Sequence, residues 1–274
     1  MTQSFKLILA YDGGNYSGWQ IQAEGRTIQG EVESALRETT GTETRVTASG
    51  RTDAGVHALG QVASFDLDTS LDINSLFRAL NAHLPKDIRA LGLEYAEPGF
   101  HAIRDAVSKR YRFFIQDGGV RDPFLRAWSW YLPQKLDDWE MHDAATELLG
   151  EHDFATYQSA GSPRSSTVRT LFDFKVERQQ GQLCEPIAIE VSANGFLYNM
   201  VRNLVGTLVE VGLGKQSVSW PREIIELRDR KAAGPTAPAH GLFLVSVEYP
   251  ATESPDSSTS SSDTGDSNGE SLDA

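Results

Sequence analysis

Asp53 and Arg51 stand close together in a glycine-flanked stretch, ASGRTDAGVHALGQVASF, at residues 48–65. Arg51 lies two residues before Asp53, Gly50 precedes the pair and Gly55 follows it. A neighbouring arginine favours the carboxylate form of an aspartate, so this pattern predicts that Asp53 is ionised at neutral pH. An ionised carboxylate that is held in a fixed position can act as a nucleophile or as a base.

The same stretch also fits a turn without any chemistry. Gly accepts positive φ and Asp accepts hydrogen bonds from its own backbone neighbours, so Ser-Gly and Asp-Ala-Gly are common in turns. Composition and spacing alone favour this second interpretation. The flanking residues, however, predict two strands: a short polar run at 45–49, and residues 61–67 with Ala63, Phe65 and Leu67 on one face. A loop between two strands is held rigidly, as a catalytic side chain requires.

Residues 1–103 are predicted to form an α+β half of the order β-α-β-β-α-β, which is the ferredoxin-like arrangement. Its first and last strands are expected at residues 5–11 and 88–94. Apolar residues at helical spacing predict two helices, one through Ile28, Val32, Ala35 and Leu36 and one through Ile73, Leu76, Phe77 and Leu80. Gly41 follows the first helix and Pro85 follows the second, and both residue types commonly mark helix ends.

Residues 104–250 are predicted to repeat this order. Strands are expected at 109–116, 167–178, 186–193 and 242–249, and helices at 139–149 and 200–211, with a short extra helix near residue 224. In the strand at 167–178, alternation places Val168, Thr170, Phe172, Phe174 and Val176 on one face. We therefore expect an α+β protein of two ferredoxin-like halves, whose antiparallel or mixed sheets adjoin and leave a cleft between them.

Tyr111 lies in the run KRYRF, in which Lys109, Arg110 and Arg112 surround aromatic residues on a predicted strand. One interpretation is a strand with its aromatic rings in the core and its cations in solvent. The other is a base-stacking platform beside a stripe of phosphate-binding cations, a common way to bind RNA. The run by itself slightly favours the first interpretation.

Arg202 is unusual because it lies near the start of the predicted helix at 200–211, whose other residues are mostly apolar. The N-terminal end of a helix favours anions, so an arginine there is electrostatically unfavourable unless a carboxylate offsets it. Asp53 is a candidate for that carboxylate.

The charge balance is strongly acidic, with a net charge of −13. Residues 251–274 hold six acidic residues and no basic ones, which leaves −7 on residues 1–250. The 251–274 segment is rich in Ser, Asp, Thr and Gly without periodicity and is predicted to be a disordered tail. An acidic chain is a poor nucleic-acid binder at low salt. Only 7 of its 25 basic residues are Lys, however, and we interpret acid-rich, lysine-poor composition as halophilic, because molar salt screens the repulsion.

Other kinds of site are not indicated. Cys184 is the single cysteine, so no internal disulfide can form. The six histidines make no metal-ligand pair at helical spacing, and Walker and GxGxxG motifs are absent, so we expect no metal or nucleotide cofactor. No apolar run is long enough to span a membrane and the first residues lack a signal-peptide pattern, so we expect a cytoplasmic protein.

Seven stretches, in order, resemble the tRNA pseudouridine synthase A family: YDGGNYSGWQIQ, TIQGEVESAL, GRTDAGVHA, NAHLP, KRYRF, GFLYNMVRNLVGTL and AGPTAPAHGL. The resemblance covers nearly the whole chain up to Tyr249. It implies the pseudouridine synthase fold and the isomerisation of uridine in the anticodon stem and loop of tRNA, typically at nucleotides 38, 39 and 40. It also implies a homodimer that binds tRNA and uses no cofactor.

The resemblance assigns a role to each residue that matches a family motif. Asp53 matches the catalytic aspartate, the presumed nucleophile, and Arg51 the arginine that helps to extrude the target nucleotide. Tyr111 matches the active-site tyrosine, and Arg202 the arginine that pairs with the aspartate. Lys109 and Arg110, from the same run as Tyr111, are expected to bind the substrate.

Two departures from the family pattern lie outside the catalytic loop. Gly14 stands where the family usually has Thr, and Arg104 is displaced by one residue from the family's arginine. These differences bear on the choice of target nucleotide rather than on the chemistry.

The reaction itself agrees with these residue types. Isomerisation breaks the N1–C1′ bond, turns the uracil over and joins C5 to C1′, so it needs a carboxylate at the sugar–base junction and no redox partner. Whether Asp53 is the nucleophile or the base that starts an elimination is left open, and Tyr111 is a candidate to take the proton from C5. Two other classes remain: a non-catalytic RNA-binding protein of the same fold, and a hydrolase that uses Asp53 and releases free uracil.

Overall fold

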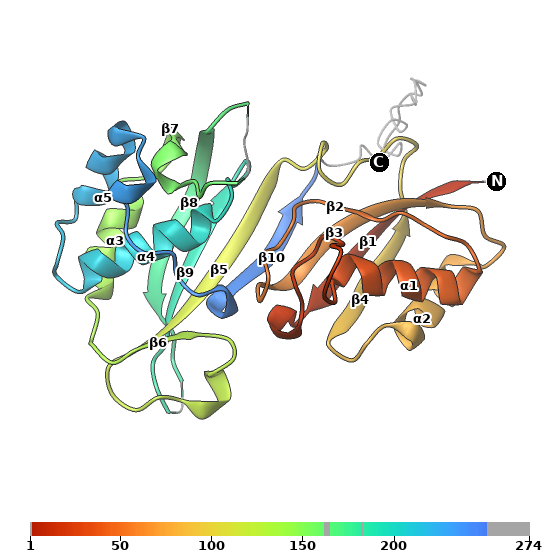
Figure 1. The fold of residues 1–274 in the computed structure, drawn as a ribbon, viewed down its shortest axis with the longest axis horizontal. Coiled ribbons are helices and arrows are strands. Elements are labelled where there is room, and N and C mark those ends of the chain that lie inside the picture. The colour runs from red at the N-terminus through yellow and green to blue at the C-terminus, as the bar shows by residue number, and fades with distance from the viewer. Residues whose placement is uncertain (1, 162–164, 182, 251–274) are drawn as a thin grey trace, which may run out of the picture.

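The structure is a computed structural model that describes residues 2–161, 165–181 and 183–250 (Figure 1). The tail predicted at residues 251–274 lies outside the described residues. In the first half the elements are β1 (Gln3–Tyr11), α1 (Ile28–Thr40), β2 (Thr47–Ala48), β3 (His57–Leu67), α2 (Ile73–His83) and β4 (Ile88–Tyr95). Each predicted strand and helix of this half is present in the predicted order.

The second half contains the predicted elements and two further short strands. Its elements are β5 (Ser108–Asp117), β6 (Trp130–Leu132), α3 (Asp138–Thr146), β7 (Gly150–Asp153), β8 (Val168–Arg178), β9 (Ile187–Ala193), α4 (Met200–Gly212), α5 (Trp220–Glu223) and β10 (Leu242–Glu248). The strands β6 and β7 were not predicted. The helix α3 ends at Thr146, earlier than predicted, because Gly150 (φ 91°) turns the chain into β7 a few residues later.

All the strands belong to one mixed sheet in the order β4-β1-β3-β10-β5-β9-β8-β7, with β2 paired to β3 and β6 paired to β5. The order β4-β1-β3 with β2 repeats as β10-β5-β9-β8, so both halves have the same ferredoxin-like topology. The predicted α+β fold is therefore confirmed. The two sheets do not merely adjoin, because β10 makes them continuous.

The strand β10 has a central position between the halves. It pairs with β3 in parallel, Phe243 beside His57, and with β5 in antiparallel, Leu242 beside Phe113. The other end of the same edge of β3 is taken by β2, whose Ala48 pairs with Ala63. The strand β2 has only two residues instead of the predicted 45–49 run, because the Val46 amide donates to Glu33 of α1 and the Val46 carbonyl accepts from Gln29 rather than pairing with β3. The loop between β2 and β3 opens directly onto the second half.

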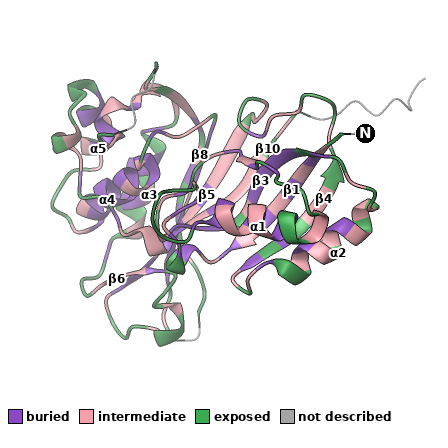
Figure 2. Ribbon diagram, turned by 45° about the vertical axis from the view of Figure 1, so that its right-hand side comes forward, coloured by how far each residue is buried: buried purple, intermediate pink, exposed green. Residues whose placement is uncertain are grey.

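Local sequence explains where the principal helices begin and end. Thr27 caps α1 by accepting a hydrogen bond from the Gly30 amide, and Gly41 ends it in the left-handed conformation (φ 73°). The helix α4 is apolar on nearly every side and is buried over most of its length, as the purple ribbon in Figure 2 shows. A helix of this kind belongs inside the protein rather than on its surface.

One predicted face of a strand is wrong. Phe172 and Val168 are 54% and 42% exposed, whereas Leu171 is buried at 2%. The pairing of β8 with β9 shifts between Leu171 and Asp173, so that Phe172 is an extra residue in the ladder. This β-bulge reverses the alternation, and only Phe174 and the residues after it follow the predicted pattern.

A row of paired residues crosses the junction of the two halves. Tyr11 pairs with Ala58, Ala58 with Leu244, and Leu244 with Tyr111. Paired residues in neighbouring strands point to the same face of a sheet, so the two tyrosines face the same side. Both are buried, with 4% and 8% of their surfaces exposed.

Candidate active site

Asp53 lies in the loop between β2 and β3, and backbone contacts from the first loop of the chain hold this segment in place. The Trp19 amide donates to the Thr52 carbonyl at 3.0 Å, and the Gly55 amide donates to the Tyr16 carbonyl at 3.4 Å. Gly18 (φ 94°) passes so close that a Cβ atom there would lie 2.7 Å from the Thr52 carbonyl oxygen. The motif YDGGNYSGWQIQ therefore supports the loop that carries Asp53.

A fully buried glutamine fastens the other side of this loop. The Gln61 amide group donates to the Gly50 carbonyl at 2.9 Å and to the Tyr11 hydroxyl at 3.3 Å, and its oxygen accepts from the Ser49 hydroxyl at 2.7 Å. The Tyr11 hydroxyl in turn lies 2.8 Å from that of Thr52. Residues 49–52 are thus tied to the sheet through side chains as well as backbone.

His57 fixes the end of the loop at the first residue of β3. Its ring is 1% exposed and stacks on Phe243 with centroids 4.7 Å apart. The Gly13 amide donates to Nδ1 at 3.1 Å, and Nε2 lies 3.2 Å from the His240 carbonyl. Burial lowers the pKa of His57, although Asp12 beside it opposes this shift. The ring therefore joins loops from both halves.

Asp53 is paired with Arg202 across the junction of the halves. The carboxylate oxygen Oδ2 lies 3.7 Å from Arg202 Nη1, and the two side chains are 30% and 18% exposed. Burial raises the pKa of Asp53 above its usual 3.8, and Arg202 acts in the opposite direction. Arg51 is exposed, and the cation that lowers the pKa of Asp53 is Arg202.

Arg202 is held in place by two further acceptors. Its Nε donates to the Ala237 carbonyl at 2.7 Å and its Nη1 donates to Asn199 Oδ1 at 3.1 Å. Asn199 is the N-cap residue of α4 and adopts the left-handed conformation (φ 58°), but its side chain does not cap the helix. The amide oxygen is used instead to hold an arginine that the helix start would otherwise disfavour.

Tyr111 lies on β5 with its ring packed edge-on against Phe196, at a centroid distance of 5.1 Å. Burial raises the pKa of its hydroxyl, and the nearby Tyr11 and Asp53 raise it further. The phenol is therefore neutral at physiological pH. The effect of Asp53 on this pKa indicates that the two side chains lie near each other.

The cations of the KRYRF run separate onto the two faces of β5. Lys109 shares the face of Tyr111 and donates to the Ser49 carbonyl at 2.6 Å, just before the loop that carries Asp53. Arg110 faces the other way and pairs with Asp173 at 2.8 Å and with Glu190 at 3.4 Å. The structure brings Lys109 to the loop that carries Asp53, but it does not bring Arg110 there.

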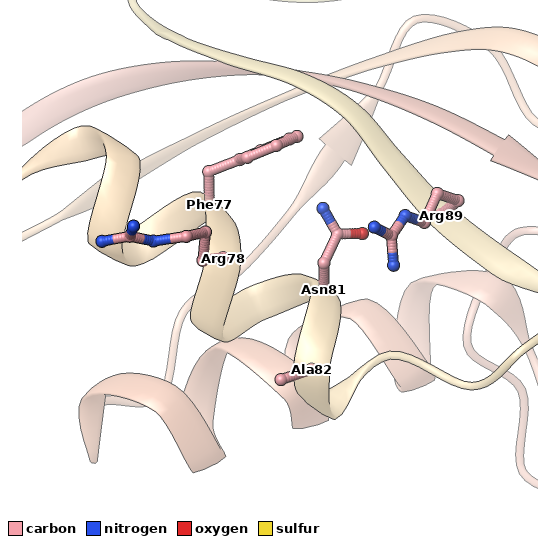
Figure 3. Close-up of a pocket in the computed structure, with 5 residues that line it drawn as sticks. All are labelled: Phe77, Arg78, Asn81, Ala82 and Arg89. Carbon is pink, nitrogen blue, oxygen red and sulfur yellow. The ribbon is translucent and has the colours of Figure 1, made fainter.

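The two described pockets lie away from Asp53. One, of about 240 Å³, is lined by Phe77, Arg78, Asn81, Ala82 and Arg89, with Asn81 and Arg89 side by side in Figure 3. The other, of about 400 Å³, lies on the outer side of α1 beside Glu33 and Arg37. Asn81 is engaged with the backbone of β4, giving and accepting hydrogen bonds with Ala90, so the NAHLP motif stabilises the fold there.

The described part of the chain holds neither a cluster of metal-binding residues nor a membrane-spanning helix. Within residues 2–161, 165–181 and 183–250, no group of three or more His, Cys, Asp or Glu is arranged to hold a metal ion. In the same part of the chain, no helix has the length and apolar character needed to cross a bilayer.

Several supporting residues were not identified as such from the sequence. Tyr11, Thr52 and Gln61 lie in or near recognisable motifs, but nothing in their spacing shows that they meet. Ala237 contributes only its backbone carbonyl, so the type of its side chain gives no sign of this role. The sequence signal for this segment was that AGPTAPAHGL, which contains Ala237, matches a family motif.

The family model described as tRNA pseudouridine synthase matches residues 7–99 and 144–250 of this chain. The chain therefore belongs to that family of isomerases, which convert uridine to pseudouridine. Curated relatives carry the name tRNA pseudouridine synthase A. One from Moorella thermoacetica is 47% identical over 246 residues, covering 89% of this chain and 98% of the relative. Another, from Maridesulfovibrio salexigens, is 43% identical over 250 residues, covering 90% of each chain.

Solved structures show only a distant likeness. A chain in the structure of an H/ACA RNP bound to a substrate RNA containing 2′-deoxyuridine is 13% identical, with a TM-score of 0.35 over 84% of this chain and 59% of the other. A chain of the archaeal box H/ACA sRNP Nop10-Cbf5 complex is 15% identical, with a TM-score of 0.33 over 85% of this chain and 60% of the other. These scores carry no argument about function.

Proposed function

We propose that this chain isomerises uridine to pseudouridine at nucleotides 38, 39 and 40 in the anticodon arm of tRNA, with Asp53 as the catalytic carboxylate. Membership of the tRNA pseudouridine synthase family and the names of its relatives support the substrate class. The observation that carries the role of Asp53 is its position: a partly buried carboxylate on a braced loop, 3.7 Å from an arginine of the opposite half.

The geometry suits a reaction at a sugar–base junction. Asp53 is the nucleophile towards the ribose or the base that starts elimination, and either role requires the ionised form that Arg202 favours. Breaking the N1–C1′ bond releases a uracil that stays bound. After the C5–C1′ bond has formed, C5 loses its proton and N1 gains one. The charge of Asp53 acts on the Tyr111 hydroxyl, and this neutral hydroxyl can accept the C5 proton only while it passes its own proton on. The ring, which is 8% exposed, is the proposed stacking surface for the base.

The target nucleotide must first leave the helical stack, which costs a few kcal/mol. Arg51 is exposed beside Asp53, as expected of a side chain that replaces the extruded nucleotide. Lys109 lies under the same loop and is the cation of the KRYRF run that can meet an RNA phosphate there. Arg110 is the weaker candidate for substrate binding because its guanidinium is paired with two carboxylates.

The proposal extends to the organisation of the enzyme. We expect residues 1–103 and 104–250 to be its two halves, a homodimer to be the working form, and the cytoplasm to be its location. Sedimentation of the purified chain with and without tRNA tests the oligomeric state.

The decisive experiment for the function has two readouts. Pseudouridine is mapped in tRNA from cells with and without this chain, and purified protein is incubated with an unmodified anticodon arm whose products are analysed by mass spectrometry. Pseudouridine at nucleotides 38–40 that depends on the chain is the expected result. Binding without turnover would indicate a non-catalytic RNA-binding protein, and release of free uracil would indicate a hydrolase.

A further inference from the structure

Residues 233–238, here called the strap, lie against α4 with unusually close backbone contact. A Cβ atom at Gly206 would lie 1.6 Å from the Pro235 carbonyl oxygen, and one at Gly234 would lie 2.6 Å from the Gly206 carbonyl oxygen. Glycine is therefore required on both sides of this contact. The strap is part of the AGPTAPAHGL motif, and most of its residues lie away from Asp53 and outside the sheet.

Side chains fasten the strap to the helix at several points. The Gly234 amide donates to Thr207 Oγ1 at 3.0 Å. Thr236 donates through its hydroxyl to Asn203 Oδ1 at 2.7 Å. Arg230 donates to the same Asn203 oxygen at 2.8 Å, to the Thr236 hydroxyl at 2.9 Å and to the Gly234 carbonyl at 2.9 Å. Asn203 is fully buried, so this network has a rigid base.

The strap ends on Arg202, one residue before Asn203 in α4. Ala237 is fully buried and donates its amide to the Arg202 carbonyl at 3.1 Å. Its own carbonyl accepts from Arg202 Nε at 2.7 Å. A guanidinium is a planar fork, so bonds from Nε to Ala237 and from Nη1 to Asn199 fix the plane of the group. That plane determines how Nη1 approaches Asp53.

We propose that Thr236 and Arg230 are positioning residues for the isomerisation: through the strap, they fix the Ala237 carbonyl that orients Arg202 towards Asp53. The inference rests on the proposed function only in that Asp53 performs the chemistry. Neither residue touches Asp53 by any described contact, and their effect passes through Arg202. A displacement on the order of 1 Å in such a group can reduce turnover about 100-fold.

Thr236 offers a sharp test because it is exposed and its hydroxyl can be removed or retained at nearly constant shape. Thr236→Val removes the hydroxyl, whereas Thr236→Ser retains it. Thr146→Val is the matched control, since Thr146 is an exposed threonine of α3 whose hydroxyl donates to the Asp143 carbonyl. Thermal unfolding of each variant verifies that it is folded.

The readouts are single-turnover pseudouridine formation against pH and tRNA affinity by filter binding. Two charged or titratable groups are known to face Asp53: Arg202 from α4 and Tyr111 from β5. For Thr236→Val we expect turnover to fall about tenfold or more, with an unchanged Kd. Its acid limb should shift to higher pH, because a misplaced Arg202 favours the carboxylate of Asp53 less. Thr236→Ser and Thr146→Val should behave as wild type.

A double-mutant cycle tests whether the effect passes through Arg202. In an Arg202→Ala background, Thr236→Val and Arg230→Met should cause no further loss of turnover. Additive losses, an unmoved pH profile in Thr236→Val, or an equal loss in Thr236→Ser would overturn the proposal. These outcomes are separate from the proposed function, which fails if the wild-type chain makes no pseudouridine or if Asp53→Asn keeps wild-type turnover.

Discussion

Two opposed effects act on the carboxyl group of Asp53. Partial burial raises its pKa, and Arg202 at 3.7 Å lowers it, with burial the larger effect. In the folded protein the ionised form is therefore less favourable than in the unfolded chain, even though the proposed chemistry needs it. Such a group stores a stability cost at the place where the reaction occurs.

Asp53→Asn separates that cost from the chemistry. Turnover should fall by many orders of magnitude, because the amide lacks both charge and nucleophilic oxygen, while tRNA affinity persists through phosphate and stacking contacts. The pKa of Asp53 is higher in the folded protein than its usual value of 3.8 in the unfolded chain. The free energy of unfolding therefore falls as the pH rises from 3.8 through the raised pKa. The melting temperature of Asp53→Asn should exceed that of wild type at pH 7, and the difference should vanish below about pH 3.8. Turnover near the wild-type rate would return the loop to a structural turn.

Arg202→Ala tests the other side of the same balance. Arg202 lowers the pKa of Asp53, so its removal should raise that pKa and move the acid limb of the turnover profile to higher pH. Turnover should decrease more than tRNA affinity, because Arg202 acts on the catalytic group rather than on the RNA. Single-turnover rates across pH, together with filter binding, measure both effects. An unchanged acid limb would show that the pair does not control Asp53.

Tyr111→Phe distinguishes the ring from the hydroxyl. The ring and its packing on Phe196 survive in the variant, so stacking and tRNA affinity should be unchanged. The hydroxyl group, which burial keeps neutral, is lost from beside Asp53, and turnover should fall about tenfold or more. Full turnover in Tyr111→Phe would remove the hydroxyl from the chemistry and leave stacking as the function of this side chain.

Motif resemblance named the candidate site residues, but the sequence did not show which residues support them. Asp53, Tyr111 and Arg202 were identified through motif resemblance, and the structure places them together. Gln61 was not identified, because its partners at positions 11, 49 and 50 become neighbours only when the sheet forms. Arg110 shows the converse: its position in KRYRF matches a motif, but strand alternation turns it to the face opposite Tyr111.

Among the elements, periodicity predicted which segments form strands and helices. It did not predict features that depend on which backbone groups pair, such as strand length and register. The two-residue length of β2 depends on the backbone of Val46, which bonds to Glu33 and Gln29 of α1 instead of β3, and residues 45–49 do not encode this. The bulge in β8 likewise depends on its register with β9. Both are non-local effects, which pattern reading within a single segment cannot detect.

The bulge makes a prediction about stability. Leu171 is 2% exposed and Phe172 is 54% exposed, although strict alternation assigns Phe172 to the core face. Leu171→Ala should lower the free energy of unfolding by about 2–4 kcal/mol, because it removes buried methyl groups and leaves a cavity. Phe172→Ala should cost less than about 1 kcal/mol. Urea unfolding of the two variants measures both values, and a larger cost for Phe172→Ala would place the bulge elsewhere.

At the scale of the whole molecule, the continuous sheet explains how a loop of one half meets a helix of the other. The strand β10 lies between β3 and β5, so the loop before β3 and the start of α4 are held against each other by backbone pairing. A pair such as Asp53–Arg202 needs this rigidity, since two separately mobile halves would not keep a 3.7 Å contact.

The acidic balance gives the last prediction. Outside residues 251–274 the net charge is −7, so self-repulsion opposes the compact state at low salt. At 1 M salt the Debye length is about 3 Å, which screens this repulsion. Salt also weakens ion pairs such as Arg37–Glu43, but such exposed pairs contribute at most about 1 kcal/mol each, so relief of repulsion should dominate. The melting temperature should therefore rise with KCl into the molar range.

A matched variant isolates the charge in this salt response. Glu97, Glu151 and Glu185 are exposed and lie outside the helices, and replacing all three with Gln reduces the negative charge without touching the core. This variant should melt at a higher temperature than wild type in low salt and gain less from added KCl, because less repulsion remains to be screened. Parallel curves for the two proteins would mean that salt acts through something other than the acidic surface, and a flat wild-type curve would contradict the halophilic interpretation of the composition.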